Sequence, residues 1–321
     1  MILKSSSFCG NRQCLISHIS YPSSRINTSD SRFQAWATLI ALAIVWGSSY
    51  ILIKKSLLAF EPWQVGYLRL SFTGLAFLPL AITKCKGLSA KQWFALLGVG
   101  VFGTGLPSFL FPYAQQELSS SLAAALSSLT PLMTLLVSII LFRLPLRKWQ
   151  LVGILLGLCG ALLLVVSRYG WFGADGVSWP LFSILLAVSA TFCYALSSNI
   201  VKRFFADTDP LMMTAGAMAP IGMLALVLLL ANGGLSLDFS GEPHLLTAYV
   251  SVVFLGLIGT ALASWLFFRL VQLTDPVFAS TVSYLVPIIA LGWGLMDGEV
   301  ITLLIGLGLA FILLGVSLTR R

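Results

Sequence analysis

GTGLPSFLFPYAQQELSSSLAAALSSLTP at residues 103–131 and GTALASWLFFRLVQLTDPVFASTVSYLVP at residues 259–287 are two copies of one segment. A shift of 156 positions aligns them without a gap, and the matched identities include Gly103/Gly259, Thr104/Thr260, Ser108/Ser264, Leu110/Leu266, Phe111/Phe267, Gln116/Gln272, Ala123/Ala279, Ser127/Ser283 and Pro131/Pro287. Both copies lie in strongly apolar sequence, which indicates an internal duplication inside a membrane protein. Duplicated membrane halves are typical of secondary transporters, whose substrate site lies at the interface between the repeats.

The composition indicates a membrane setting for the whole chain. The sequence is 58% hydrophobic and only 9% charged, and its mean hydropathy is +0.96. A soluble domain carries roughly 25% charged residues. A chain this poor in charge could not cover its own surface in water.

Ten apolar segments are long enough to cross a bilayer, and turn-forming residues such as Asn232-Gly233-Gly234 separate them. Apolar runs of this length must be helices in lipid, because a helix satisfies its own backbone hydrogen bonds. The sequence therefore predicts an all-α membrane protein with ten transmembrane helices, at residues 35–57, 62–83, 92–113, 120–142, 149–167, 178–201, 211–231, 246–269, 276–296 and 299–318. The short connections leave no room for a soluble catalytic domain.

Lysine and arginine are concentrated on one side of this arrangement. With the N-terminus in the cytoplasm, the outer side holds only Lys54, Lys55 and Arg168, and Arg69 falls within the second helix. The inner side holds Lys4, Arg12, Arg25, Arg32, Lys84, Lys86, Lys91, Arg143, Arg147, Lys148, Lys202, Arg203, Arg269, Arg320 and Arg321. This positive-inside bias predicts cytoplasmic termini in an inner or plasma membrane protein. The net charge of +8 is thus a topology signal, and nucleic-acid binding is excluded because the basic residues are scattered.

The duplication extends upstream at a shift of 148 positions. Trp46 to Ser49 then falls on Tyr194 to Ser197, and Glu61-Pro62 falls on Asp209-Pro210. Each repeat therefore spans five helices, at residues 35–168 and 178–318. Because five is odd, the second copy enters the membrane upside down, and we predict two inverted five-helix repeats. The alternative is chance similarity between apolar stretches, against which the matching of glycines, prolines and hydroxyls argues.

The chain resembles a known family between residues 35 and 318. The residues that carry the resemblance are Trp46-Gly47-Ser48-Ser49-Tyr50, Pro62, Arg69, the run from Ser119 to Leu129, Thr130-Pro131, Pro287, Gly298-Glu299 and the glycines from Gly306 to Gly315. In these it is similar to the EamA-like ten-helix permeases of the drug/metabolite transporter superfamily. The family's Gly-Glu pair after the fourth helix is missing, because Arg143 stands where the duplication places Glu299. The resemblance implies transport of a small metabolite.

Hydroxyls and prolines repeated in both halves are candidates for the substrate site. Thr104 with Ser108, and their counterparts Thr260 with Ser264, are four residues apart and share a helix face. Ser127 with Pro131, and Ser283 with Pro287, repeat that spacing, and a proline within a helix frees a carbonyl that can bind a polar solute. The alternatives are hydroxyl bonding to the helix's own backbone and kinks that serve packing alone.

Aromatic residues inside the spans complete the predicted set of substrate-binding residues. Trp46, Tyr50, Tyr194, Trp265 and Tyr284 lie within spans, where rings suit an apolar solute or an ammonium group, although packing against lipid is the alternative. Ser49 and Ser198 accompany the rings of the first and sixth helices. Arg69 is either a structural anchor near the interface or a residue with a substrate or gating role.

Other chemistry is not indicated. No Asp, Glu or His lies in the middle of a predicted span, and the sequence has neither a phosphate-binding loop nor a metal-spaced Cys/His cluster. We therefore predict no enzymatic activity, no metal and no cofactor. Residues 1–34 contain serine and four basic residues, and a disordered tail or a misplaced start codon is favoured over an organellar transit peptide.

These features predict a transporter that moves a small organic solute by alternating access. An amino acid or a similar metabolite, in the direction of export, is the substrate class that the resemblance implies. One alternative is a sugar-phosphate or nucleotide-sugar exchanger, whose phosphate-binding site would require a cluster of basic residues. Alternatives from another class are a lipid scramblase and a membrane sensor. The partners are the solute and the bilayer, with a homodimer left open.

The charge bias predicts that the C-terminus faces the cytoplasm. In a variant without the native cysteines, an Arg321→Cys substitution should react with a membrane-impermeant maleimide only after the cells are permeabilised. Labelling in intact cells would contradict the predicted topology.

Overall fold

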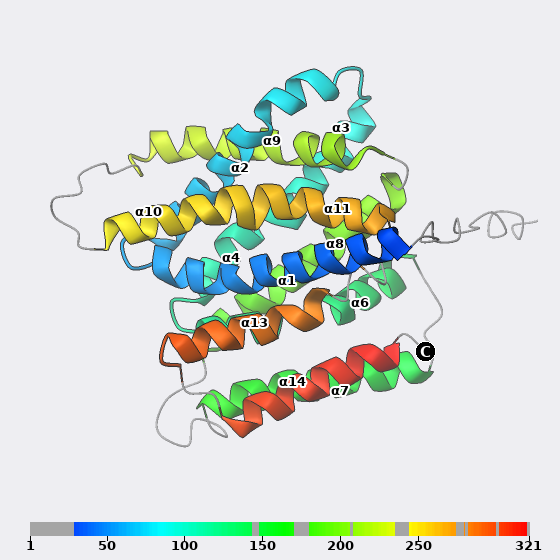
Figure 1. Ribbon diagram of the computed structural model, residues 1–321, viewed down its shortest axis with the longest axis vertical. Helices are drawn as coiled ribbons and strands as arrows, with labels where there is room; N and C mark the ends of the chain where they lie inside the picture. The colour runs from blue at the N-terminus through cyan, green and yellow to red at the C-terminus, as the bar shows by residue number, and fades with distance from the viewer. Residues whose placement is uncertain are drawn as a thin grey trace, which may run out of the picture.

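A computed structural model describes residues 29–142, 148–169, 180–205, 208–234, 244–273, 279, 282–299 and 302–319. Within these ranges every regular element is a helix, which confirms an all-α protein (Figure 1). Several residues named from the sequence lie outside the described residues: the tail as far as residue 28, Arg143, Arg147, Arg320 and Arg321.

The helices follow the predicted apolar segments closely. They are α1 (Ser29–Ser56), α2 (Pro62–Lys84), α3 (Ala90–Gly100), η1 (Val101–Gly105), α4 (Pro107–Ala114), α5 (Ser120–Ser127), α6 (Thr130–Phe142), α7 (Lys148–Tyr169), α8 (Leu181–Phe204), α9 (Pro210–Ala231), α10 (Leu245–Phe254), η3 (Leu255–Leu262), α11 (Ala263–Leu273), α13 (Val282–Met296) and α14 (Leu303–Thr319). Eight helical stretches are long and apolar enough to cross a membrane, and 282–296 and 303–315 are shorter apolar helices. The protein is therefore an all-α membrane protein, and the count of ten crossings stays a prediction.

Polar residues in the connections start two of the helices. The Glu61 side chain accepts from the backbone of Gln64, whose side chain in turn accepts from the Glu61 N–H at 2.8 Å, and Pro62 opens α2 without needing an N–H partner. Asp209 caps α9 in a similar place, because its carboxylate accepts from the Leu211 N–H at 3.1 Å. The duplicated Glu61-Pro62 and Asp209-Pro210 thus mark equivalent helix starts.

Two helical stretches contain a π-helical segment, and each segment overlaps the start of one of the duplicated segments. η1 covers Val101–Gly105 and η3 covers Leu255–Leu262, so the shift of 156 residues places the first inside the second. A π turn widens the helix by one residue and is frequently found at functional sites. The third and eighth predicted helices are therefore continuous but locally unwound.

The fourth predicted helix is interrupted, a break that was not predicted. The segment 120–142 forms α5 and α6, with a break at Ser128 and Leu129. Pro131 is the second residue of α6, where its missing N–H costs nothing, so the chain ends one helix and starts another in place of a kink. Pro287 lies inside α13, as the sequence predicted.

Two helix pairs form opposite edges of the bundle. α2 packs against α9 and α7 packs against α14, as Figure 1 shows at the top and bottom of the view. Between them, α1 contacts α10, α11 and α13, and α8 contacts α4 and α6. The central helices bring residues far apart in sequence, such as Ala43 and Ala290, into one buried core.

Glycines allow the edge pairs to approach closely. A Cβ atom on Gly74 would lie 2.6 Å from the Cα atom of Gly222, and one on Gly160 would lie 2.6 Å from the carbonyl oxygen of Gly308. Close approach of backbones is the main source of helix association in lipid, because hydrocarbon provides no hydrophobic driving force between helices.

The contact between Gly74 and Gly222 predicts a position that tolerates no side chain. Gly74→Ala should lower the melting temperature of the purified protein, since overpacking costs about 1–3 kcal/mol and backbone atoms cannot rotate away. Gly292→Ala in α13 is the control, because a Cβ there meets nothing within 4 Å. Equal melting temperatures for the two variants would contradict the packing.

Candidate solute-binding site

Arg69 is a charged residue in the interior of the bundle. It lies in α2, its side chain is buried, and only 8% of the residue's surface is exposed. The guanidinium Nε–H donates to Thr260 Oγ1 at 2.7 Å, which joins α2 to η3. The four ion pairs of the described residues all involve lysines, so Arg69 has no carboxylate partner among them. A buried cation of this kind is costly and is a candidate for function.

The π-helical segment η3 is the hub of this cluster. Thr260 Oγ1 donates to the Leu255 carbonyl at 2.8 Å, five residues back along the widened turn. The indole Nε1–H of Trp46, in α1, donates to the Gly259 carbonyl at 3.2 Å. Thr73 Oγ1 shares its hydrogen between the Arg69 carbonyl and the Gly256 carbonyl, at 2.9 Å each. The widened helix thus offers its carbonyls to both α1 and α2.

Two tyrosines approach Arg69 from α1 and α8. The hydroxyl groups of Tyr50 and Tyr194 are near enough to interact electrostatically with the guanidinium group. The Tyr50 hydroxyl is also within interaction range of the side chain of Ser127, the last residue of α5. Phenolic hydroxyls can both donate and accept, so this set surrounds the cation with adaptable polar groups.

Aromatic rings enclose the same region. Phe111 packs edge-on against Tyr50, with ring centroids 5.3 Å apart, and stacks on Tyr194 at 6.2 Å. Trp46 packs against Phe267 at 5.3 Å. Phe111 and Phe267 were not predicted as site residues, although the same residue occupies this position in both copies.

Six of the predicted site residues contribute to this central cluster or directly adjoin it: Trp46, Ser49, Tyr50, Ser127, Tyr194 and Thr260. Ser49 is buried, and its oxygen would lie 3.0 Å from a Cβ on Gly259. The sequence alone does not distinguish a structural role for Arg69 from a substrate or gating role. Its position beside Thr260 depends on two helices 191 residues apart in the chain, which sequence spacing does not predict.

The other predicted site residues lie in varied surroundings. Thr104 and Ser108 are buried, and Ser108 Oγ has no hydrogen-bond partner among the described residues. Ser198 is exposed and donates to the Tyr194 carbonyl at 2.9 Å, whereas Trp265 packs in a separate cluster and lies 5.8 Å from the Arg269 guanidinium. Pro287 is buried, and the remaining predicted residues are half-buried: Pro131, Ser264, Ser283 and Tyr284.

A second polar cluster joins the C-terminal end of α1 to the connection between α13 and α14. Asp297 pairs with Lys54 at 2.6 Å and with Lys55 at 2.5 Å, and Lys54 also reaches Glu299 at 3.3 Å. We call Lys54, Lys55, Asp297 and Glu299 the end clasp. Its contacts span more than 240 residues of sequence.

Glu299 also caps a helix from the first copy. Its carboxylate accepts from the N–H of Ser120 at 3.1 Å and of Ser121 at 3.2 Å, and from both serine hydroxyls. Burial opposes ionisation of this carboxyl, but the hydrogen bonds from Ser121 and Ser120 and the charge of Lys54 hold the pKa of Glu299 below its usual range. Hydrogen bonds from Lys54 and Lys55 likewise lower the pKa of Asp297. The Gly-Glu pair found by sequence therefore ties the α13–α14 connection to α5.

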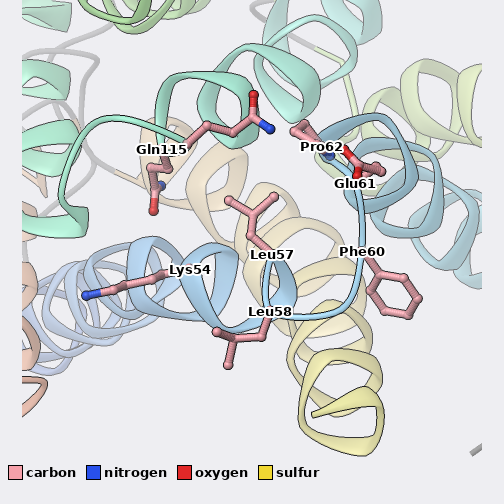
Figure 2. Close-up of a pocket in the computed structure, with 8 residues that line it drawn as sticks. Lys54, Leu57, Leu58, Phe60, Glu61, Pro62 and Gln115 are labelled. Carbon is pink, nitrogen blue, oxygen red and sulfur yellow. The ribbon is translucent and has the colours of Figure 1, made fainter. Parts of the chain in front are cut away.

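A cavity of about 350 Å³ lies beside the end clasp (Figure 2). It is lined by the end of α1, the start of α2 and the turn after α4: Lys54, Leu57, Leu58, Phe60, Glu61, Pro62, Gln115 and Gln116. The amide of Gln115 is buried and has no hydrogen-bond partner among the described residues. The described residues contain no His/Cys/Asp/Glu cluster that could hold a metal ion.

A multi-pass helical membrane protein with a buried polar centre has the architecture of a solute transporter. The model of the EamA-like transporter family matches residues 34–166 and 181–321, so the chain belongs to this family, which confirms the resemblance. It is a membrane transporter and not an enzyme.

Similar proteins agree with this assignment. The inner membrane transporter YedA of Escherichia coli K12, named as uncharacterized, is 30% identical over 291 residues, which cover 88% of this chain and 89% of YedA. The protein PecM of Dickeya dadantii is 25% identical, over 78% of this chain and 80% of PecM. A solved crystal structure has a TM-score of 0.59 at 19% identity, over 88% of this chain and 95% of that one, and shows the same fold.

The lowered pKa values of Asp297 and Glu299 predict how the end clasp responds to acid. A carboxyl group whose pKa is lowered by folding stabilises the protein at pH values above its pKa in the unfolded state, which is about 4. This stabilisation is lost as the pH falls through the lowered pKa of the folded state. At pH 7 the free energy of unfolding of the wild type should therefore exceed that of a Lys54→Met, Lys55→Met double variant by about 0.2–1 kcal/mol for each ion pair. The wild type should also have the higher melting temperature. The difference should shrink towards pH 3.

The exposed pair between Lys84 and Asp209 supplies the control, with an N–O distance of 3.3 Å and side chains 43% and 49% exposed. Lys84→Met should leave the melting temperature nearly unchanged at every pH. A clasp effect that stays constant down to pH 3 would contradict the assignment.

Proposed function

We propose that the protein is a secondary transporter that exports a small organic metabolite, an amino acid or a similar compound, by alternating access. The observation that carries this proposal is the polar cluster of Arg69, Thr260, Tyr50 and Tyr194. These residues come from both copies of the duplicated sequence, and they lie within helices that are otherwise strongly apolar. Substrate sites of duplicated transporters lie at such a seam.

The contact between Gly74 and Gly222 supports an inverted repeat. These two glycines are equivalent at the shift of 148 residues, and they touch each other. Equivalent residues meet only where a pseudo-two-fold axis passes between them. Contacts such as Cys85 with Met212 and Lys84 with Asp209, beside the contact of Gly74 with Gly222, run in the antiparallel sense that an inverted pair requires.

The aromatic contacts support the same symmetry. Trp46 packs on Phe267, and Tyr194 packs on Phe111. Trp46 is equivalent to Tyr194, and Phe111 is equivalent to Phe267, so one contact occurs twice with the copies exchanged. We infer ten crossings in two repeats, 35–168 and 178–318, with α13 and α14 as the last two.

The two ends of the bundle differ in a way that suits alternating access. The end clasp ties the C-terminal end of α1 to the connection between α13 and α14. With both termini in the cytoplasm, the clasp would lie at the outer end of the bundle and hold that end closed. Release of the solute would then require the clasp to part.

Proton coupling through an acid in the middle of a membrane span has no support among the residues that the structure describes. The Asp and Glu residues whose side chains the structure describes lie at helix ends or in connections: Glu61, Glu117, Asp209, Asp297 and Glu299. A phosphate-bearing substrate is also disfavoured, since Arg69 is the single cation of the central cluster.

Transport can be tested with the purified protein in liposomes. A thermal-shift screen against amino acids, nucleosides, polyamines and sugar phosphates should find a ligand, and the radiolabelled ligand should show counterflow without a pH gradient. Failure of every stabilising ligand to show counterflow would contradict a transport function.

Loss of a hydroxyl that binds this ligand should weaken binding several-fold. Ser264→Ala or Ser283→Ala should cost about 0.5–1.5 kcal/mol of binding without unfolding the protein. Ser317→Ala is the control, because its exposed hydroxyl bonds only within α14, to the Leu314 carbonyl at 2.9 Å. Unchanged affinity in both test variants would remove these serines from the pocket.

A further inference from the structure

We propose that the transported solute carries one carboxylate group and that Arg69 binds it. This inference rests on the proposed transport function and narrows its substrate class to monocarboxylates, including zwitterionic amino acids. It depends on three features of Arg69: its uncompensated charge, its free donors and the residue that replaces it in the second copy.

The charge of Arg69 is uncompensated within the described part of the chain. The residue is 92% buried, and no carboxylate there lies within ion-pairing distance. A buried charge is costly unless it is paired. The hydroxyls of Thr260, Tyr50 and Tyr194 lessen the cost but bring no opposite charge. A ligand with one negative charge would neutralise the site.

The guanidinium group also keeps donors for a ligand. Among the described residues, the guanidinium group donates one hydrogen bond, from its Nε–H to Thr260 Oγ1 at 2.7 Å. The Nη–H groups remain, and arginine binds carboxylates through two parallel hydrogen bonds. Because the Thr260 hydroxyl itself donates to the Leu255 carbonyl at 2.8 Å, the π-helical segment holds the guanidinium group in place.

The second copy of the sequence provides an internal control for packing. At the shift of 148 residues Arg69 falls on Ala217. Ala217 is fully buried, and its carbonyl lies against Gly100 in α3. The equivalent place in the fold is therefore filled by a methyl group, so packing of the repeat does not require an arginine. The charge at position 69 is a departure from the repeat, which argues for binding.

The number of charges selects among anionic groups. One guanidinium matches a carboxylate, whereas a phosphate monoester carries about −1.5 to −2 charges at neutral pH and would leave charge unpaired. The rings of Trp46, Tyr50 and Tyr194 suit an apolar body, and their faces can also attract an ammonium group. A monocarboxylate with an apolar or zwitterionic body fits this combination.

Four compounds with one phenyl ring and different head groups test the inference on the wild-type protein. The probes are phenylacetate, phenylalanine, phenethylamine and phenyl phosphate, and the measurement is ligand-induced thermal stabilisation of the purified protein at pH 7. Phenylacetate and phenylalanine should stabilise it, and phenethylamine and phenyl phosphate should not. Equal or stronger stabilisation by the amine or the phosphate overturns the inference, as does no effect of either carboxylate at millimolar concentration.

Substitution of the arginine gives a second readout. Arg69→Gln should weaken binding of the carboxylates about 10- to 100-fold, the loss expected for a charge-assisted hydrogen bond. Arg69→Lys keeps the charge and should retain a preference for carboxylates at reduced affinity. The control Arg269→Gln removes an exposed arginine of α11 and should bind as wild type does. Wild-type affinity in Arg69→Gln overturns the inference, and if that variant does not fold, the wild-type probe series and Arg69→Lys decide.

Failure of the inference and failure of the proposed function give different results. Selective binding of carboxylates without counterflow in liposomes would contradict transport and leave Arg69 as an anion-binding residue. Counterflow of phenethylamine or phenyl phosphate, undiminished in Arg69→Gln, would support transport and overturn the carboxylate assignment.

Discussion

Close backbone packing between helices is the constraint on which the rest of this structure depends. Lipid provides no hydrophobic driving force for helix association, so helices must gain their contacts by approaching closely. Gly74 with Gly222 and Gly160 with Gly308 allow this at the two edge pairs, α2 with α9 and α7 with α14. The central helices lie between these two edge pairs.

The duplicated sequence makes a frame, and its departures from duplication are the chemically distinctive residues. In the alignment of the two copies Arg69 is equivalent to Ala217, and Glu299 is equivalent to Arg143, which lies outside the described residues. The first departure places a cation in the centre, and the second places an acid that caps α5 and meets Lys54. A perfectly symmetric protein would have two equivalent centres and two equivalent ends, and so no preferred arrangement of charge.

The π-helical segments connect the frame to the site. A widened turn moves carbonyls off the helix axis, where other groups can reach them. In η3 the carbonyls of Leu255, Gly256 and Gly259 accept from Thr260, Thr73 and Trp46 respectively. These bonds join α1 and α2 to η3. A shift in any of the three elements would therefore change the position of Arg69 relative to its hydrogen-bond partner Thr260.

The sequence by itself determined the membrane setting, the helical class, the family and the approximate ends of the helices. These follow from local properties: apolar length, turn residues such as Pro62 and Asp209, and the similarity between segments 103–131 and 259–287. Six residues of the predicted site also lie around Arg69 or next to it, because residues retained in both copies tend to lie at the interface between the repeats. The break before Pro131 escaped prediction, since a proline in an apolar run can either bend a helix or begin one. Only the tertiary structure decided the partners of Arg69, Phe111 and Glu299. Their contacts join helices far apart in the chain, and the side-chain distances that give a charge or a ring its role are set by packing in three dimensions.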